Sequence, residues 1–169
     1  MKILKTDCLS DGFRMPGEFE KQDGCLMIYP WRPGSWNYNA KYARDVFVQI
    51  AHILAAYEDI YMIVRPEDMK ETITRLDHPH IHIIEASSND AWARDTGPTF
   101  VVNDKGERRG INWEFNAWGG SYDGLYSHWE NDQVIPSLIC ESLGDDLYEA
   151  RPFVLEGGSI HVDGEGTLI

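Results

Sequence analysis

The feature that most limits the fold is an alternation of apolar runs with amphipathic segments in the first half of the chain. The runs 25–29, 59–64 and 80–85 are short, rich in Ile, Val, Met and Tyr, and predict strands. Between them, apolar residues recur at spacings of three and four over 43–57, and a short segment at 66–76 begins with a proline and two acidic residues. Both patterns predict helices, so the alternation indicates an α/β fold.

The second half contains two segments with the same plan, RDTGPTFVVNDKGE (94–107) and LEGGSIHVDGEG (155–166). Each has a carboxylate, a glycine two positions later, a predicted strand and an acidic turn that contains glycine, and each is predicted to form a hairpin. Between them, a helix is predicted over part of 131–143. A repeated unit of this size favours a ring-like α/β arrangement in which equivalent strand ends point at one centre. The two carboxylates, Asp95 and Glu156, are then expected to face the same cavity.

Charge and cysteine content limit the partners of the chain. Its 169 residues fit one domain or part of a larger one, and 28 acidic against 15 basic residues give a net charge of −13. This charge disfavours nucleic acid and anionic lipid surfaces and attracts small cations. There is no apolar run of about 18 residues that would suggest a membrane span. Cys8, Cys25 and Cys140 have no metal-binding spacing and indicate reduced thiols in a cytoplasm.

Asp95 and Glu156 are the leading candidates for binding a ligand. The simple interpretation of Asp95 is an ion pair with Arg94 or a cap of the Gly-Pro turn. The functional interpretation is a carboxylate held at a strand edge to bind a cation. Gly157 and Gly158 follow Glu156 and permit close approach of backbone or ligand. Two carboxylates at equivalent positions suit a planar guanidinium, whose N–H groups take bidentate partners.

Two tryptophans are candidates for the walls of such a site. Trp113 alternates with a glutamate on a predicted strand and is interpreted as core. Trp92 stands in a crowded charged segment, and Trp118 precedes two glycines in a polar loop, where an indole face could cover a ligand stem or its cation. Asn116 and Asp123, in the same region as Trp118, could supply polar contacts.

Other reactive side chains give weaker signals. His161, Asp163 and Glu165 alternate and suggest a metal site, but Asp-Gly-Glu is also typical of a turn, which is the favoured interpretation. His161 is left open between a site residue and a hydrogen-bonded strand residue. Cys140 lies in an apolar helical context and is interpreted as a buried thiol. No cysteine has a neighbouring base or cation, so the chain shows no evident nucleophile.

Four segments carry a resemblance to a known family. They resemble, in matching order, the agmatine deiminases, guanidino-group-modifying enzymes with the pentein fold, a five-bladed propeller of ββαβ modules. The opening segment favours agmatine deiminase over the related bacterial peptidylarginine deiminases. The segments are DGFRMPGEFE (11–20), NDAWARDTGPTFVVN (89–103), WEFNAWGG (113–120) and LEGGSIHVDGEGT (155–167).

The resemblance implies hydrolysis of agmatine to N-carbamoylputrescine and ammonia in putrescine biosynthesis, without a metal or an organic cofactor. A cysteine thiolate attacks the guanidinium carbon, ammonia leaves, and a histidine-assisted water releases the product. Asp95 and Glu156 match the acidic residues that hold the guanidinium. Trp92 and Trp118 match tryptophans that line the site. The full-length enzyme is expected to be a cytoplasmic homo-oligomer.

One departure from the family pattern is large. The family's catalytic cysteine and histidine both lie beyond residue 169, and neither Cys140 nor His161 matches them. Residues 1–169 are therefore expected to be the N-terminal portion of a single pentein domain, roughly two of its five modules, and to be inactive alone. Two alternatives stay open: a peptidylarginine deiminase, and a non-catalytic module that binds polyamines or guanidines.

Overall fold

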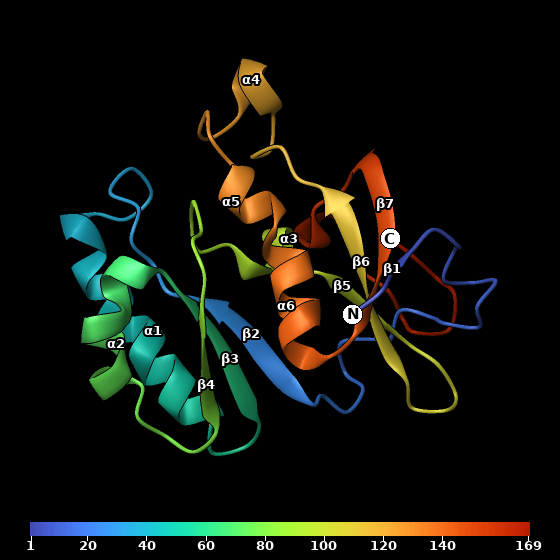
Figure 1. Cartoon of the computed structure of the whole chain (residues 1–169), viewed down its shortest axis with the longest axis horizontal. Coiled ribbons are helices and arrows are strands. Elements are labelled where there is room, and N and C mark those ends of the chain that lie inside the picture. The colour runs from blue at the N-terminus through green and yellow to red at the C-terminus, as the bar shows by residue number, and fades with distance from the viewer. The chain divides into compact units, whose positions relative to one another are not determined.

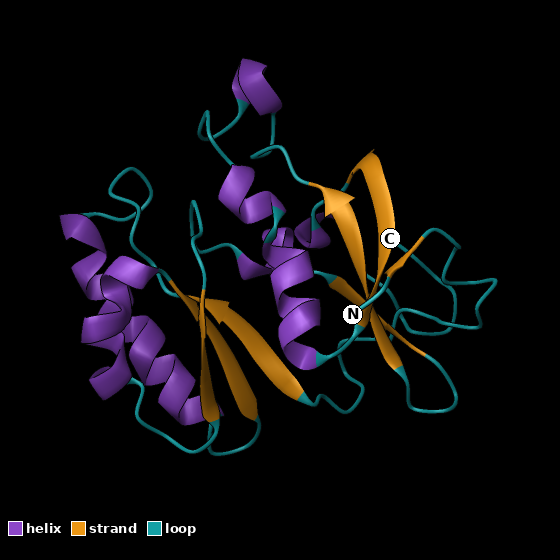
Figure 2. Ribbon diagram, in the orientation of Figure 1, coloured by secondary structure: helices purple, strands orange, loops and turns teal.

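The chain divides into two units in a computed structural model that describes residues 1–169 (Figure 1). Unit 1 consists of Met1–Glu20 together with Arg94–Ile169, and unit 2 is Lys21–Ala93. Figure 2 shows that each unit combines strands with helices. The sequence had indicated an α/β fold, which both units confirm, and each unit is described by itself.

Unit 2 is a three-stranded parallel sheet with two connecting helices. Its strands, in sheet order, are β2 (Gly24–Ile28), β3 (Asp59–Val64) and β4 (Ile81–Glu85). Helix α1 (Lys41–Leu54) joins β2 to β3, and α2 (Met69–Arg75) joins β3 to β4. The predicted alternation is therefore confirmed, with the first strand shifted by one residue. Parallel neighbours need crossover connections of this kind, because a tight turn cannot return the chain to the start of the sheet.

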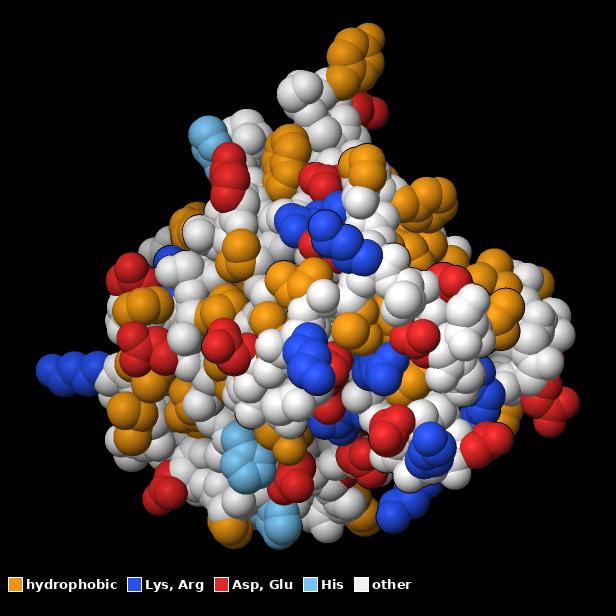
Figure 3. Space-filling view, turned by 45° about the vertical axis from the view of Figure 1, so that its right-hand side comes forward, with side chains coloured by type: hydrophobic (Ala, Val, Ile, Leu, Met, Phe, Trp, Pro, Cys, Tyr) orange, Lys and Arg blue, Asp and Glu red, His pale blue; other side chains and the backbone are white.

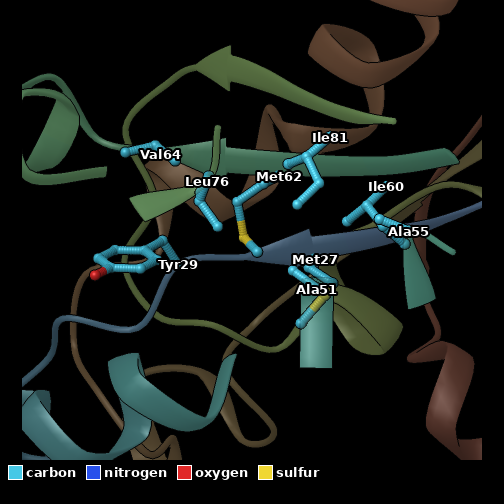
Figure 4. Packing of buried hydrophobic residues seen from close by; sticks show 9 residues of the cluster. All are labelled: Met27, Tyr29, Ala51, Ala55, Ile60, Met62, Val64, Leu76 and Ile81. Atoms are coloured by element: carbon cyan, nitrogen blue, oxygen red, sulfur yellow. The ribbon is translucent and has the colours of Figure 1, made fainter. Parts of the chain in front are cut away.

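The core of unit 2 lies between its sheet and its two helices. Short 3-10 turns at Tyr38–Ala40 and Pro66–Asp68 lead into α1 and α2. Pro66 suits this position because its fixed φ fits a helix start and its missing N–H would have no helical partner. Figure 4 shows how strand and helix side chains interdigitate. The buried residues of this cluster are Met27, Tyr29, Ala51, Ala55, Ile60, Met62, Val64, Leu76 and Ile81.

Unit 1 contains a four-stranded mixed sheet. Strands β5 (Thr99–Val102) and β6 (Arg108–Glu114) form the antiparallel hairpin that the sequence predicted. Strand β7 (Asp146–Val154) pairs parallel to β6, and β1 (Ile3–Leu4) pairs parallel to β7. The order β1-β7-β6-β5 therefore joins residues from the two ends of the chain in one sheet.

The helices of unit 1 are mostly short. They are α3 (Ala93–Thr96), whose first residue closes unit 2, then α4 (Gly120–Asp123), α5 (Glu130–Gln133) and α6 (Ile135–Leu143), with a 3-10 turn at Gly157–Ser159. The helix predicted within 131–143 is thus confirmed as two successive helices. Pro136 stands in the first turn of the second one, where proline is tolerated. None of the chain's helices has both the length and the apolar character needed to cross a membrane.

Helix α6 packs on β6 and β7 and completes a β-β-α-β order. A Cβ added to Gly110 of β6 would collide with the sulfur of Cys140 and would lie 3.1 Å from Leu147 Cδ1, so glycine sets how closely α6 approaches the sheet. Cys140 is fully buried, and this burial raises the pKa of its thiol to about 12. The interpretation of Cys140 as a buried thiol is confirmed.

Two parts of the predicted pattern differ from the structure. The second hairpin is reduced to a bridge between Val162 and Leu168, with reciprocal backbone hydrogen bonds between His161 and Ile169 of 2.7 and 2.9 Å. The sequence also gave no indication of β1 or of the length of β7. Both pair with distant segments, and β7 lacks a clean apolar alternation because Glu149 and Arg151 interrupt it.

Candidate functional site

The structure brings the segment of Asp95 into direct contact with the segment of Glu156. Asp95 lies on α3, immediately before β5, and its Oδ1 accepts the backbone N–H of Gly158 at 3.0 Å. A Cβ on Gly157 would collide with the backbone oxygen of Arg94, and one on Gly158 would lie 2.7 Å from Asp95 Oδ1. The prediction that these glycines permit close backbone approach is confirmed. Asp95 itself stands on a helical turn rather than at a strand edge.

Glu156 is held by its main chain and not by its side chain. Its backbone oxygen accepts the N–H and the hydroxyl of Ser159 at 2.9 and 2.7 Å, which fixes the turn after β7. Its carboxylate is half-buried and makes no hydrogen bond or ion pair within the chain. A half-buried carboxylate without a partner is costly, and a cationic ligand would remove that cost.

An open pocket of about 370 Å³ lies beside this junction. Ligand pockets typically measure about 300–1,000 Å³, so the volume suits a small molecule. The Arg94 guanidinium lies on its wall and pairs with Glu18 Oε1 at 2.7 Å. Asp95 and Glu156 are sequence neighbours of the wall rather than part of it. The lining residues are Glu18, Arg94, Gly157, Gly158, Ser159, Ile160, His161 and Ile169.

Trp92 is held in unit 2 by an aromatic stack. Its ring lies 5.5 Å from that of Trp36 at an interplanar angle of 25°, and Trp36 meets Phe47 edge to face at 5.8 Å. The Trp92 side chain nonetheless remains 37% exposed. A large aromatic that is stacked on one face and partly open elsewhere has little freedom to lose on binding, which suits a ligand-contacting residue.

Asp90 holds the segment that carries Trp92 in place through buried hydrogen bonds, a role that sequence reasoning missed. This carboxylate is only 1% exposed and accepts the indole N–H of Trp36 at 3.0 Å, the backbone N–H of Ala91 at 2.9 Å and the hydroxyl of Ser35. The indole N–H of Trp31 donates to the Ser88 carbonyl at 3.1 Å. Together these bonds tie the loop after β2 to the segment before Trp92. The crowding of charge and aromatics around Asp90 was the available signal.

Trp118 packs against two other aromatic side chains in unit 1. Its ring meets Phe115 at 5.2 Å and Tyr126 at 6.2 Å, both edge to face, and it is 36% exposed. Its φ is 64° and that of Ala117 is 54°, so two consecutive non-glycine residues adopt the left-handed region. Such strain persists only where surrounding packing enforces it, and it is concentrated at binding sites. The neighbouring Asn116 has a buried Oδ1 without a hydrogen-bond partner.

The DGF part of the opening motif anchors the N-terminal segment to the sheet of unit 1. Asp11 Oδ2 accepts hydrogen bonds from the Tyr148 hydroxyl and from Arg109, both at 2.8 Å, and from the Thr6 hydroxyl at 2.9 Å. The bond from Tyr148 is the main reason that the pKa of Asp11 is lowered. Phe13 is buried against β5, β6 and β7. This part of the motif is therefore structural.

The rest of the opening motif clamps the turn at 163–166. Arg14 donates to both carboxylate oxygens of Glu20 at 2.7 and 2.8 Å and to the Gly164 carbonyl at 3.3 Å. Glu20 also accepts the Gly17 N–H at 2.8 Å. The Arg14 hydrogen bonds are the largest cause of the lowered pKa of Glu20, which falls from 4.5 to about 2.

Acid should therefore weaken this clamp in a defined pH window. Because the folded-state pKa of Glu20 is depressed, its contribution to stability is present above pH 4.5 and is lost as the pH falls toward about 2. We expect the urea midpoint of Glu20→Gln to fall less than that of the unchanged protein across this window. Glu67→Gln, at an exposed position of unit 2, is the control. Equal acid sensitivity of the Glu20→Gln variant and the unchanged protein would contradict the assignment.

The alternating His161, Asp163 and Glu165 do not form a metal site. Asp163 Oδ1 accepts the backbone N–H groups of Glu165 and Thr167 at 2.8 and 3.0 Å, which is turn chemistry, as the sequence favoured. No group of three or more His, Cys, Asp or Glu side chains is placed to share a metal ion. His161 instead lines the pocket.

The surface carries mixed charge. On the face shown in Figure 3, Asp and Glu side chains lie among Lys and Arg side chains. Some acidic side chains are therefore neutralised locally, as in the Arg14–Glu20 and Arg94–Glu18 pairs. The carboxylate of Glu156 is not neutralised in this way.

The chain is similar over its whole length to proteins of known family. The chain is 48% identical to an agmatine deiminase of Pseudomonas syringae pathovar tomato, over 100% of the chain and 46% of that protein. It superposes on the solved agmatine deiminase of Enterococcus faecalis with a TM-score of 0.95 and 44% identity, over 99% of the chain and 46% of that structure. The chain thus spans about half the length of these relatives.

The sequence model of a family described as Porphyromonas-type peptidyl-arginine deiminase matches residues 14–169. The match begins at Arg14 of the clamp and includes Asp95, Glu156 and both candidate tryptophans. With the whole chain sharing the fold of the relatives and nearly all of it matching the family pattern, the chain belongs to the Porphyromonas-type peptidyl-arginine deiminase family.

Proposed function

We propose that this chain is the N-terminal portion of an agmatine deiminase, which hydrolyses the guanidino group of agmatine to N-carbamoylputrescine and ammonia. The observation that carries the proposal is the half-buried, unpartnered carboxylate of Glu156, next to the two glycines that contact the Asp95 segment. The names of the similar proteins from Pseudomonas syringae and Enterococcus faecalis support the same activity.

Asp95 and Glu156 would hold the guanidinium from two sides. Asp95 uses Oδ1 for the Gly158 N–H, which orients the carboxylate and leaves Oδ2 available to the ligand. Glu156 has both oxygens available. Carboxylates pair with guanidinium through parallel charge-assisted bonds, which fix the plane of the group as well as its position. Trp92 and Trp118 would cover the apolar stem and the cationic ends.

The attacking thiolate would come from a part of the protein outside this chain. Cys140 is unsuited, because it is buried behind β6 and its thiol has a pKa of about 12. A cysteine sulfur would add to the guanidinium carbon, and the resulting C–N cleavage would release ammonia. Water, deprotonated by a histidine, would then break the C–S bond, return the thiol and leave the urea-type product.

The two units would be parts of one pentein domain. The β5-β6-α6-β7 order in unit 1 follows the ββαβ plan of such a module, and the remaining modules would complete the ring. The three free cysteines fit a reducing cytoplasm. We also propose that the product enters putrescine synthesis and that the complete protein is a homo-oligomer.

The proposal is tested by substrate comparison with the complete protein. We expect kcat/KM for agmatine to exceed that for an arginine peptide blocked at both ends by at least about 100-fold. The reason is that agmatine ends in an ammonium group at the far end from its guanidinium, whereas the blocked peptide has no charge there for the enzyme to bind. The 169-residue chain alone should release no ammonia from agmatine. Ammonia release by the chain alone would refute the need for an external thiolate.

A second candidate is a peptidylarginine deiminase, which the description of the matching family favours. It uses the same guanidinium chemistry and differs in accepting a peptide where agmatine ends in an ammonium group. The reverse order of the two kcat/KM values would establish it.

A further inference from the structure

Helix α1 has two apolar faces, and only one of them is used inside unit 2. One face packs on the parallel sheet through Ala51 and Ala55, with Phe47 and Leu54 beside them. The other face carries a row of exposed apolar side chains, whose exposed fractions run from 40% to 87%. This row, called the α1 stripe below, consists of Tyr42, Val46, Ile50, Ile53 and, in the turn after the helix, Tyr57.

The α1 stripe is continuous rather than scattered. At 3.6 residues per turn, Tyr42, Val46, Ile50 and Ile53 fall within an arc of about 80°. A helix that is apolar on both faces is normally buried on both. The stripe exposes on the order of 600 Å² per chain, at the upper end of the largest patches on ordinary monomers. Isolated exposed apolar residues need no explanation, but a row of this size indicates a contact surface.

We propose that the α1 stripe is the core of an interface with a second copy of this chain, in which the two α1 helices pack antiparallel around a twofold axis beside Gln49 and Ile50. A twofold interface requires a surface that complements itself. The spacing along the stripe meets this requirement, because Tyr42 and Tyr57 lie equally far in sequence from the point between Gln49 and Ile50, and so do Val46 and Ile53.

The antiparallel register also matches the charges at the start of α1 and in the segment that follows it. It places Tyr42 against Tyr57, Val46 against Ile53, and Lys41 against Glu58 of the second copy. A parallel arrangement would bring Lys41 against Lys41 and Glu58 against Glu58, which is unfavourable. An exposed area on the order of 600 Å² per copy approaches the roughly 800 Å² per partner of a stable interface, and the polar rim would supply the remainder.

The inference rests on the proposed homo-oligomeric state, for which it names the contact surface, and not on the proposed enzymatic activity, so its test has a physical readout. We expect sedimentation velocity of the complete protein at micromolar concentration to show a dimer or a higher even-numbered assembly. Val46→Asp and Ile53→Lys should each weaken the dimer by at least about 100-fold in Kd, because each buries a charge without a partner in an apolar contact. Both side chains are exposed in the monomer, so circular dichroism should stay unchanged.

The register is tested by combining the two changes. In the antiparallel dimer, the carboxylate at position 46 of one copy faces the ammonium at position 53 of the other. The double variant Val46→Asp/Ile53→Lys should therefore recover to within about 10-fold of the original Kd. Leu9→Asp, which alters an exposed apolar residue of unit 1, is the matched control and should leave the assembly intact.

Three outcomes would overturn the proposal: a monomeric complete protein at micromolar concentration, single variants that sediment like the unchanged protein, and a double variant that stays as dissociated as the single variants. A monomeric complete protein would mean that the α1 stripe contacts something other than a second copy. The second would place the contact between copies elsewhere. The third would exclude the antiparallel register.

Discussion

Turnover of agmatine by the complete protein should fall by about 10²–10³-fold in kcat/KM when Glu156 is changed to glutamine, a loss comparable to removal of one preorganised group from a catalytic site. Glu156→Gln keeps the size of the side chain and replaces a negative oxygen with an NH₂ group that opposes the guanidinium. Since the Glu156 carboxylate has no partner in the chain, the change removes no internal bond. Steady-state kinetics with agmatine measures the effect.

Asp95→Asn should give a loss of the same order. The asparagine Oδ1 can still accept the Gly158 N–H, so the α3 turn should stay in place while the charge is lost. Asp104→Asn, at the exposed tip of the β5–β6 hairpin, removes the same charge away from the site and serves as the control for both variants. Full activity in either Glu156→Gln or Asp95→Asn, with unchanged thermal unfolding, would remove that residue from the guanidinium site.

The second large effect concerns Asp90 and is one of stability. Asp90→Ala should lower the free energy of unfolding by about 3 kcal/mol, because it leaves the Trp36 indole, the Ala91 N–H and the Ser35 hydroxyl buried without their acceptor. Urea unfolding followed by tryptophan fluorescence is the measurement. The stack of Trp36 on Trp92 makes the emission report directly on this region.

Two further variants separate the role of Asp90 from a general effect of charge. Asp90→Asn retains one acceptor oxygen and should cost less than half as much as Asp90→Ala. Asp104→Ala removes an exposed carboxylate and should change stability by no more than about 0.5 kcal/mol. If Asp90→Ala were no more destabilising than Asp104→Ala, the buried hydrogen bonds of Asp90 would not be what holds Trp92.

Sequence reasoning succeeded where the physical cause is local. The 3.6-residue period of α1, the short apolar run of β5 and the glycine-containing turn before β6 are set by neighbouring residues, and these elements appear where predicted. The same holds for Asp163, whose turn bonds reach only two and four residues along the chain.

Sequence reasoning failed where the cause is a distant partner. Strand β1 is two residues long and exists because it pairs with β7, more than a hundred positions away. The role of Asp90 depends on a loop 54 positions earlier that presents the Trp36 indole. Neither partner leaves a periodic signal in the local sequence, because a long-range contact imposes no spacing on the residues around it.

The sequence by itself determined the α/β class, the elements with strong periodicity, and the pairing of Asp95 with Glu156 as candidates through their shared surroundings. Only the tertiary structure decided that the glycines after Glu156 contact the backbone before Asp95. It also decided that Arg94 forms an ion pair with Glu18 and that one apolar face of α1 is exposed. The reason is that local patterns fix backbone conformation, whereas the meeting of two segments depends on packing summed over the whole unit.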